Sequence, residues 1–194
     1  MLHTRIVDSK DNKLSILEAE NFISSSKFGA SIFFTGTVRN QNNNQSVIGI
    51  TYDSHDELVR KSFEEIYNEA DQKLNISDKA VFIEHAKGYL NIGEISIIIA
   101  VACKHRDNAY VLSRYIIEEI KKRSPIWKKE HYENVDSEWL KGNPIANEKF
   151  NGNEGYKKIV NSSAFCSENN NIVSDNYKIK NNEKIAIIPP IGGG

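Results

Sequence analysis

The fold is decided by residues 94–103, which read EISIIIAVAC. This stretch is almost entirely apolar and rich in β-branched residues, as is typical of a strand that is buried on both faces. A turn near Gly88 and a break at Gly93 separate it from a second strand, which we predict over residues 80–85. We therefore expect residues 94–103 to form a central, buried strand of a sheet.

The apolar pattern elsewhere predicts further strands over residues 30–38 and 47–52, together with helices. A first helix is expected after the capping box formed by Ser15 and Glu18. A second is expected between Val59 and Leu74, where apolar residues recur at helical spacing. A third is expected to start at a cap on Asp107 and to end at the basic residues before Pro125. Strands and helices that mix without strict βαβ alternation indicate an α+β fold.

Composition excludes several classes of protein. The 194-residue chain is 39% hydrophobic and carries a net charge of −1, which counts against a surface devoted to nucleic acid or to an anionic membrane. Cys103 and Cys166 lack metal-site spacing, so we expect neither a disulfide framework nor a metal site. The longest apolar run is too short to span a bilayer, and no secretion signal begins the chain. We expect a cytoplasmic protein.

The composition and the apolar pattern of the chain change after Trp139. Apolar periodicity disappears and asparagine becomes frequent, which indicates a linker. A short strand is expected again over residues 184–188, before the ending PPIGGG. We therefore divide the chain into a domain over residues 1–141, a linker over 142–160 and a C-terminal segment over 161–194.

Basic residues stand at three boundaries between predicted elements, where binding sites are usually built. They are Arg39, the run Lys104-His105-Arg106, and residues 121–130, KKRSPIWKKE. Each group alone is explained by a solvated, charged end of a helix or strand. Brought together, they would form a pocket that holds a phosphate or carboxylate, and crowding would lower the pKa of a lysine enough for it to act as a base or nucleophile. This reasoning indicates an anion site without separating an enzyme from a binding protein.

Three motifs carry a more specific signal: Phe-x-Gly-x-Val-Arg over residues 34–39, Lys-His-Arg over 104–106, and Lys-x-x-x-Pro-x-Trp-Lys-x-Glu over 121–130. In order and spacing, residues 6–139 resemble the large, catalytic subunit of molybdopterin synthase. The resemblance implies an α/β hammerhead fold and a central homodimer. It also implies a sulfurtransferase that moves sulfur from a C-terminal glycine thiocarboxylate to cyclic pyranopterin monophosphate, forming the molybdopterin dithiolene. The pterin is a substrate, so no metal or tightly bound cofactor is expected.

The resemblance also implies roles for individual residues. The catalytic residues would be Lys121 and Lys128, and the substrate-binding residues would be Arg39, His105, Arg106 and Glu130. Lys122 stands where the family need not have a base. An arginine that the family tends to carry a few residues after the Trp139 position is absent here, where Lys141 is the nearest cation.

The last eleven residues, KIAIIPPIGGG, are similar to the end of the ubiquitin-like small subunit that carries the sulfur. The resemblance implies a partial β-grasp segment whose Gly193 and Gly194 carry sulfur after an adenylating enzyme activates the terminus. A plain flexible terminus is the alternative. About 35 residues are too few for a carrier core of their own. The tail therefore leans on the large domain, pairs with a separate carrier, or is a remnant.

Two other functions remain open from the sequence. One is a non-catalytic module that binds the glycine tail of a ubiquitin-like sulfur carrier. The other is a nucleic-acid binder, against which stand the net charge and the lack of aromatic residues between the basic groups.

Overall fold

The computed structural model describes residues 1–133 and three short strands at 164–166, 172–173 and 186–188. The elements of the first part are β1 (Leu2–Asp8), α1 (Ile16–Ile23), β2 (Ala30–Thr37), β3 (Gln41–Asn42), β4 (Gln45–Ser54), α2 (Asp56–Leu74), β5 (Lys79–Asn91), β6 (Ile95–Cys103), α3 (Arg106–Arg123) and β7 (Ile126–Tyr132). The short strands are β8 (Ala164–Cys166), β9 (Ile172–Val173) and β10 (Ala186–Ile188).

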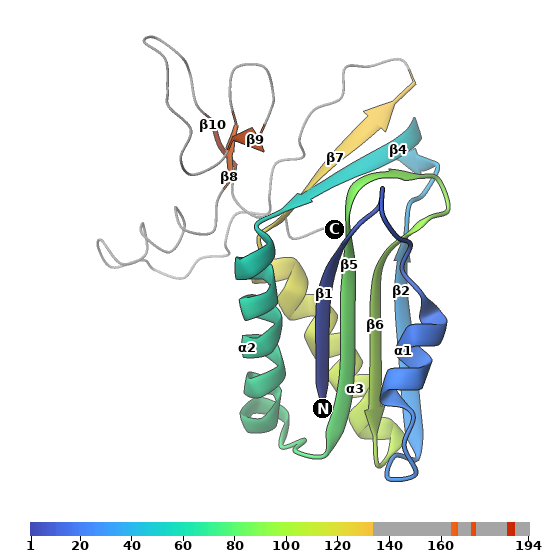
Figure 1. Cartoon of the computed structure of the whole chain (residues 1–194), viewed down its shortest axis with the longest axis vertical. Coiled ribbons are helices and arrows are strands. Elements are labelled where there is room, and N and C mark those ends of the chain that lie inside the picture. The colour runs from blue at the N-terminus through green and yellow to red at the C-terminus, as the bar shows by residue number, and fades with distance from the viewer. Residues whose placement is uncertain (134–163, 167–171, 174–185, 189–194) are drawn as a thin grey trace, which may run out of the picture.

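Strand β6 lies where its apolar sequence predicts, between β2 and β5 and buried along nearly its whole length. The sheet has seven strands in the order β2-β6-β5-β4-β3, with β1 added to β5 and β7 added to β4 (Figure 1). The β1–β5 pair is parallel, and the other pairs are antiparallel. The expected mixture of strands and helices is confirmed, and the sheet itself is open and mainly antiparallel.

Strand β5 does not turn near Gly88, which corrects the prediction from sequence. It runs on to Asn91, and Gly88 is the point where it changes partners. Up to Lys87 the strand pairs with β1, and from Gly88 onwards it pairs with β4. Gly88 has φ +96°, and a Cβ there would lie 2.6 Å from the Ser9 hydroxyl. Only glycine fits this corner comfortably, because that backbone conformation is strained for other residues.

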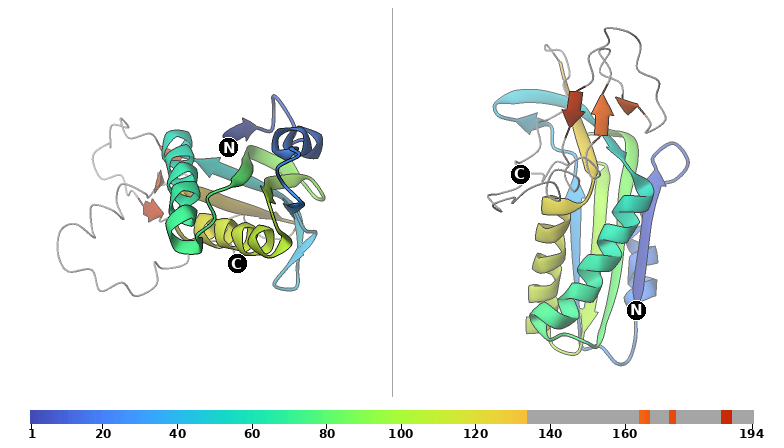
Figure 2. Two further views of the ribbon diagram at one scale, coloured as in Figure 1. Left: turned by 90° about the horizontal axis from the view of Figure 1, so that it is seen from below. Right: turned by 90° about the vertical axis from the view of Figure 1, so that its left-hand side faces the viewer.

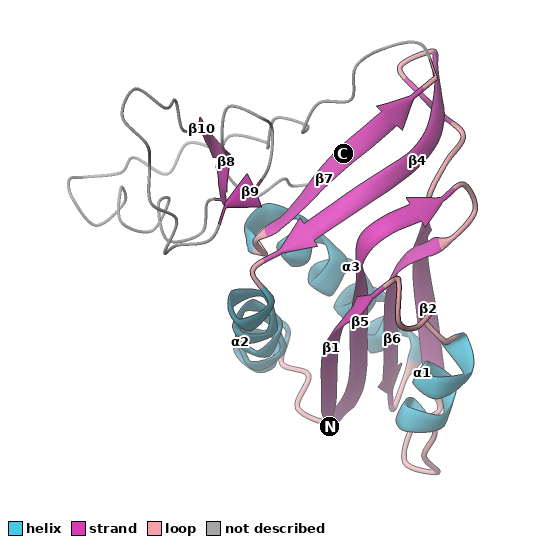
Figure 3. Ribbon diagram, turned by 45° about the horizontal axis from the view of Figure 1, so that its top comes forward, coloured by secondary structure: helices cyan, strands magenta, loops and turns pink. Residues whose placement is uncertain are grey.

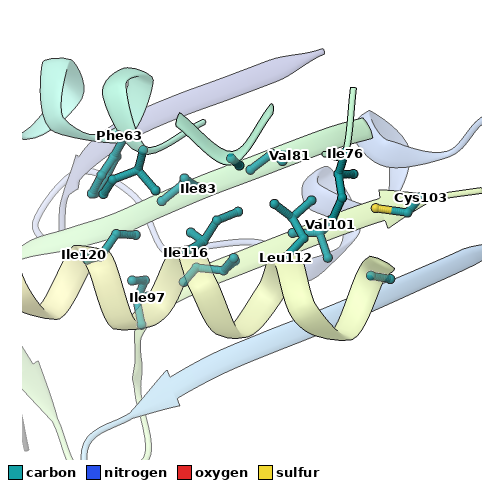
Figure 4. Close-up of a cluster of buried hydrophobic side chains, with 14 of the residues drawn as sticks. Phe63, Ile76, Val81, Ile83, Ile97, Val101, Cys103, Leu112, Ile116 and Ile120 are labelled. Carbon is teal, nitrogen blue, oxygen red and sulfur yellow. The ribbon is translucent and has the colours of Figure 1, made fainter. Parts of the chain in front are cut away.

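The helices lie on opposite faces of the sheet, with α2 and α3 on one side and α1 on the other (Figure 2). Alternation along β5 follows this layering, since Val81 and Ile83 join the core beneath α2 and α3, whereas Ala80 and Phe82 pack under α1. Figure 4 shows the larger core, in which side chains from α2, α3, β5 and β6 meet. Because Ile116 and Ile120 pack in this core, it positions the last turn of α3 and the basic residues there.

The helix boundaries confirm most of the predicted signals. Ser15 accepts a hydrogen bond from the backbone N–H of Glu18 and opens α1. The third helix is capped two residues earlier than predicted, because His105 is the capping residue and Asp107 lies in the first turn. There its charge still suits the helix dipole. The helix ends as predicted, with three basic residues in its last turn and Ser124 as the closing residue.

Strand β7 brings the third basic group alongside β4. Figure 3 shows the two strands side by side at an angle to the rest of the sheet. In their antiparallel register Lys128 faces Tyr52 and Glu130 faces Ile50. None of the helices in the described part of the chain is long and apolar enough to cross a membrane. The linker and most of the expected β-grasp segment lie outside the described residues. Strand β10 falls within the strand expected at 184–188 and pairs with β8.

Candidate functional site

A polar pocket lies where the larger core reaches the β4–β7 arm. Along β5 the inward row runs Val81, Ile83 and then His85, so an apolar row ends in a histidine. Along α3 the row of Ile116 and Ile120 ends at Ser124 in the same way. The resulting cavity has a volume of about 340 Å³ and is lined by residues of β2, β3, β4, β5, β6, α3 and β7. A cavity of this size suits a small organic ligand.

Four of the six predicted pocket residues line this cavity. They are Arg39, which follows β2, Lys121 in the last turn of α3, and Lys128 and Glu130 on β7. The residue that follows β2, the last turn of α3 and strand β7 thus bring three cations to one cavity. The structure brings these residues together as the motifs predict, while their individual roles remain predictions.

Glu130 fixes the charge balance of the pocket. Its carboxylate is 2% exposed and accepts hydrogen bonds from Lys128 Nζ at 2.7 Å, from Asn42 Nδ2 at 2.7 Å and from the Tyr132 hydroxyl. Burial alone would raise the pKa of Glu130, but the hydrogen bonds from Lys128, Tyr132 and Asn42 outweigh it and hold the pKa below its usual value. Glu130 is therefore an ionised anchor that orients Lys128 and has no proton to give.

Lys121 stands in contrast to Lys128. In the described part of the chain it has no ion-pair partner, and its side chain is half-buried at the cavity wall. The neighbouring Lys122 turns away and pairs with Glu119 at the helix surface, with its side chain 65% exposed. This difference agrees with the sequence interpretation that set Lys122 apart from the site.

His105 and Arg106 do not line the cavity of their own chain. They precede and begin α3, whereas Lys121 lies in its last turn. The helix has 18 residues, so its ends are about 27 Å apart at about 1.5 Å per residue. Arg106 is exposed there and its nearest acidic neighbour is Asp107, at 3.8 Å. One small substrate cannot touch both ends of the helix. A single chain therefore does not gather all six predicted residues, and His105 and Arg106 could join the site only from a second chain.

Three uncharged polar side chains of the pocket were not predicted from the sequence. His85 on β5, Tyr52 on β4 and Ser96 on β6 all line it, and burial raises the pKa of Tyr52, against a hydrogen bond with Ser96. The available signal was the period-two row that ends in His85. In the described residues no group of three or more histidine, cysteine, aspartate or glutamate side chains is placed to hold a metal.

Most of the described part of the chain is similar to known proteins. The family described as "MoaE protein" matches residues 9–123. The molybdopterin synthase catalytic subunit of Synechococcus elongatus is 40% identical over 131 residues, covering 68% of this chain and 79% of that protein. The crystal structure of molybdopterin synthase from Staphylococcus aureus superposes with a TM-score of 0.64 at 31% identity, covering 70% and 94% of the two chains. A complex of subunits 1 and 2 of molybdopterin-converting factor from Helicobacter pylori superposes with a TM-score of 0.54 at 25% identity, covering 79% and 95%.

Proposed function

This chain belongs to the MoaE protein family and acts in molybdopterin biosynthesis, and we propose that it does so as the sulfur-transferring catalytic subunit of a molybdopterin synthase. The reaction would move sulfur from a C-terminal glycine thiocarboxylate to cyclic pyranopterin monophosphate. The observation that carries the proposal is the single cavity that gathers Arg39, Lys121 and Lys128. Both reactants are anionic, and preorganised cations stabilise charge that develops between them.

The two lysines would have different tasks. Lys128 is held by Glu130 at 2.7 Å, so its ammonium group has a fixed position and supplies a constant positive charge. Lys121 has no such partner in the described residues, so it is available to contact the substrate directly and to exchange a proton with it. We propose Lys121 as the residue closest to the chemistry and Lys128 as its electrostatic support.

A homodimer would account for His105 and Arg106. We propose that the beginning of α3 from a second copy completes the cavity, because within one chain the two ends of that helix are too far apart. Mixing two inactive variants, Lys121→Ala and Arg106→Ala, tests this arrangement. A shared site leaves one intact cavity in each mixed dimer, so about a quarter of wild-type activity should return after random exchange. A site made within one chain would return none.

The sulfur donor would be a separate small subunit, the C-terminal tail of this chain, or both. A small-subunit partner is supported by the similarity to the two-subunit complex from Helicobacter pylori. Gly193 and Gly194 lie outside the described residues, and their role remains a proposal from the sequence. We propose that the tail occupies the carrier groove and is poorly activated. Incubation with an adenylating enzyme, ATP and sulfide, followed by intact-mass measurement, would reject this view if an oxygen of this chain were replaced by sulfur.

The decisive assay combines the protein with cyclic pyranopterin monophosphate, with and without an added thiocarboxylated carrier. Molybdopterin is then converted to its fluorescent oxidation products and quantified. We expect formation of product that depends on the thiocarboxylate. Carrier binding without product would instead identify the chain as a non-catalytic module for the glycine tail.

A further inference from the structure

His85 lines the cavity in a constrained position. It is 7% exposed, its Nδ1 lies 2.7 Å from the carbonyl oxygen of Ala86, and the ring of Tyr52 meets it edge-on at 4.9 Å. Strand β5 sets its direction, because it continues the inward row of Val81 and Ile83. The imidazole is thus held from two sides and cannot rotate freely to serve another element.

These contacts determine which nitrogen carries the proton. A carbonyl oxygen only accepts hydrogen bonds, so Nδ1 of His85 is the donor to Ala86. In the neutral ring Nε2 is then a lone-pair acceptor, and no other group in the described part of the chain donates to it. Burial lowers the pKa of His85 to about 4, so the ring is neutral at neutral pH. An unused acceptor therefore lines the cavity.

This acceptor complements the cationic side of the cavity. Arg39, Lys121 and Lys128 can only donate hydrogen bonds, and the carboxylate of Glu130 is already occupied by three donors. Donors suit the cyclic phosphate of the proposed substrate, because a phosphodiester presents only acceptors at neutral pH. A ring that carries N–H or O–H groups needs an acceptor as well, and an unmatched polar group in a buried site lowers affinity.

We propose that His85 is a specificity-determining residue that accepts, at Nε2, an N–H or O–H hydrogen bond from the uncharged ring system of the substrate. The inference rests on the proposed function and divides the cavity into two parts. The cationic part would hold the phosphate, and the His85 part would hold the heterocycle. His85 would act in recognition and would not exchange protons with the reacting atoms.

Two matched substitutions separate this role from a purely structural one. His85→Asn keeps a donor near the Nδ1 position for the Ala86 carbonyl but has no atom at the Nε2 position. His85→Gln places an amide near the Nε2 position. We expect His85→Asn to raise KM for cyclic pyranopterin monophosphate about threefold to tenfold with kcat within about twofold, and His85→Gln to recover most of the loss. The reverse order, which the bond to Ala86 alone predicts, would overturn the proposal.

Direct binding keeps the inference separate from the proposed function. In titration calorimetry without a carrier, His85→Asn should bind the cyclic pterin less tightly than wild type but bind inorganic phosphate equally well. Equal pterin affinity, or a parallel loss of phosphate affinity, would refute the division of the cavity. Absence of molybdopterin formation by the wild-type protein would instead reject the proposed function.

Should both substitutions destabilise the fold, the wild-type protein still provides a test. Labelled with ¹⁵N-histidine, it should show the Nε2 signal of His85 shifting on addition of the cyclic pterin and staying in place on addition of phosphate, because only the pterin would donate to that nitrogen. An unmoved signal at saturating pterin would rule the contact out.

Discussion

Replacing Lys128 by alanine should destabilise the protein as well as impair it, because the substitution leaves the Glu130 carboxylate without its cation. The two groups are 2.7 Å apart, and Glu130 is 2% exposed. Breaking a fully buried ion pair from one side costs about 3–5 kcal/mol. Here the Lys128 side chain is 21% exposed, and Asn42 and Tyr132 still donate to the carboxylate, so we expect about 2 kcal/mol.

Thermal unfolding followed by circular dichroism measures this loss. For a chain of this size about 2 kcal/mol corresponds to a fall in Tm of roughly 4–8 °C. Adding Glu130→Gln to Lys128→Ala removes the stranded charge and should recover at least half of the fall. Lys121→Ala is the matched control, since it removes a lysine from the same cavity without breaking an ion pair of the described residues, and should change stability by less than about 0.5 kcal/mol.

The loss in Lys128→Ala should also depend on pH. Burial pushes the pKa of Glu130 upwards, and in the wild type the hydrogen bonds from Lys128, Tyr132 and Asn42 overcome that push. Without Lys128 the folded state favours the protonated carboxyl more strongly, so stability is lost as pH rises. The deficit against wild type should be larger at pH 8 than at pH 5. An equal fall in Tm for Lys121→Ala, or a double variant no better than the single one, would refute this account of Glu130.

Three further outcomes are expected. Lys121→Ala should abolish or nearly abolish molybdopterin formation, whereas Lys122→Ala should retain it; equal activity in the fluorescence assay would place the catalytic lysine elsewhere. Hydrogen bonds from Arg123 lower the pKa of Glu69 from 4.5 to about 2, so its stabilising effect is present above pH 4.5 and lost as pH falls towards 2. Glu69→Gln should accordingly flatten the dependence of unfolding free energy on pH in that window, measured by urea titration. Deleting Gly193-Gly194 should leave turnover with a separate carrier unchanged or higher, since the proposed tethered tail would compete with the carrier for its groove. Loss of turnover would make the tail the working donor.

The sequence predicted the elements whose burial pattern is local. Strand β6 can be recognised from its apolar run alone, and the cap of α1 is a hydrogen bond between Ser15 and Glu18, which are near neighbours in sequence. Strand β1 was not predicted, because nearly all of its residues are half-buried and its position depends on the pairing with β5, which is distant in sequence. Gly88 was read as a turn for a related reason. A glycine with positive φ serves a turn and a corner within a strand equally well, and only the pairing with β4 distinguishes them.

The candidate site was predicted as far as its charges. Arg39 follows β2, Lys121 lies in the last turn of α3 and Lys128 is near the start of β7, and all three belong to motifs that can be recognised from residue order. The place of His85 in the pocket was not predicted, because in the sequence it follows an apolar strand and only the structure shows that the core ends there. The position of Arg106 outside the pocket was not predicted, because motifs give only the order of residues along the chain. They do not show that the length of α3 separates Arg106 from Lys121.

The late position of β7 has a consequence for biosynthesis on the ribosome. Strand β4 is made early, yet one of its edges is paired only when residues 126–132 emerge. Until then the nascent chain can bury the β5–β6 core but presents an open strand edge, which is a template for unwanted pairing with other chains. The same late step delivers Lys128 and Glu130. A chain halted before this strand would therefore lack two residues of the candidate site and keep an exposed strand edge, so one late segment completes both the pocket and the sheet.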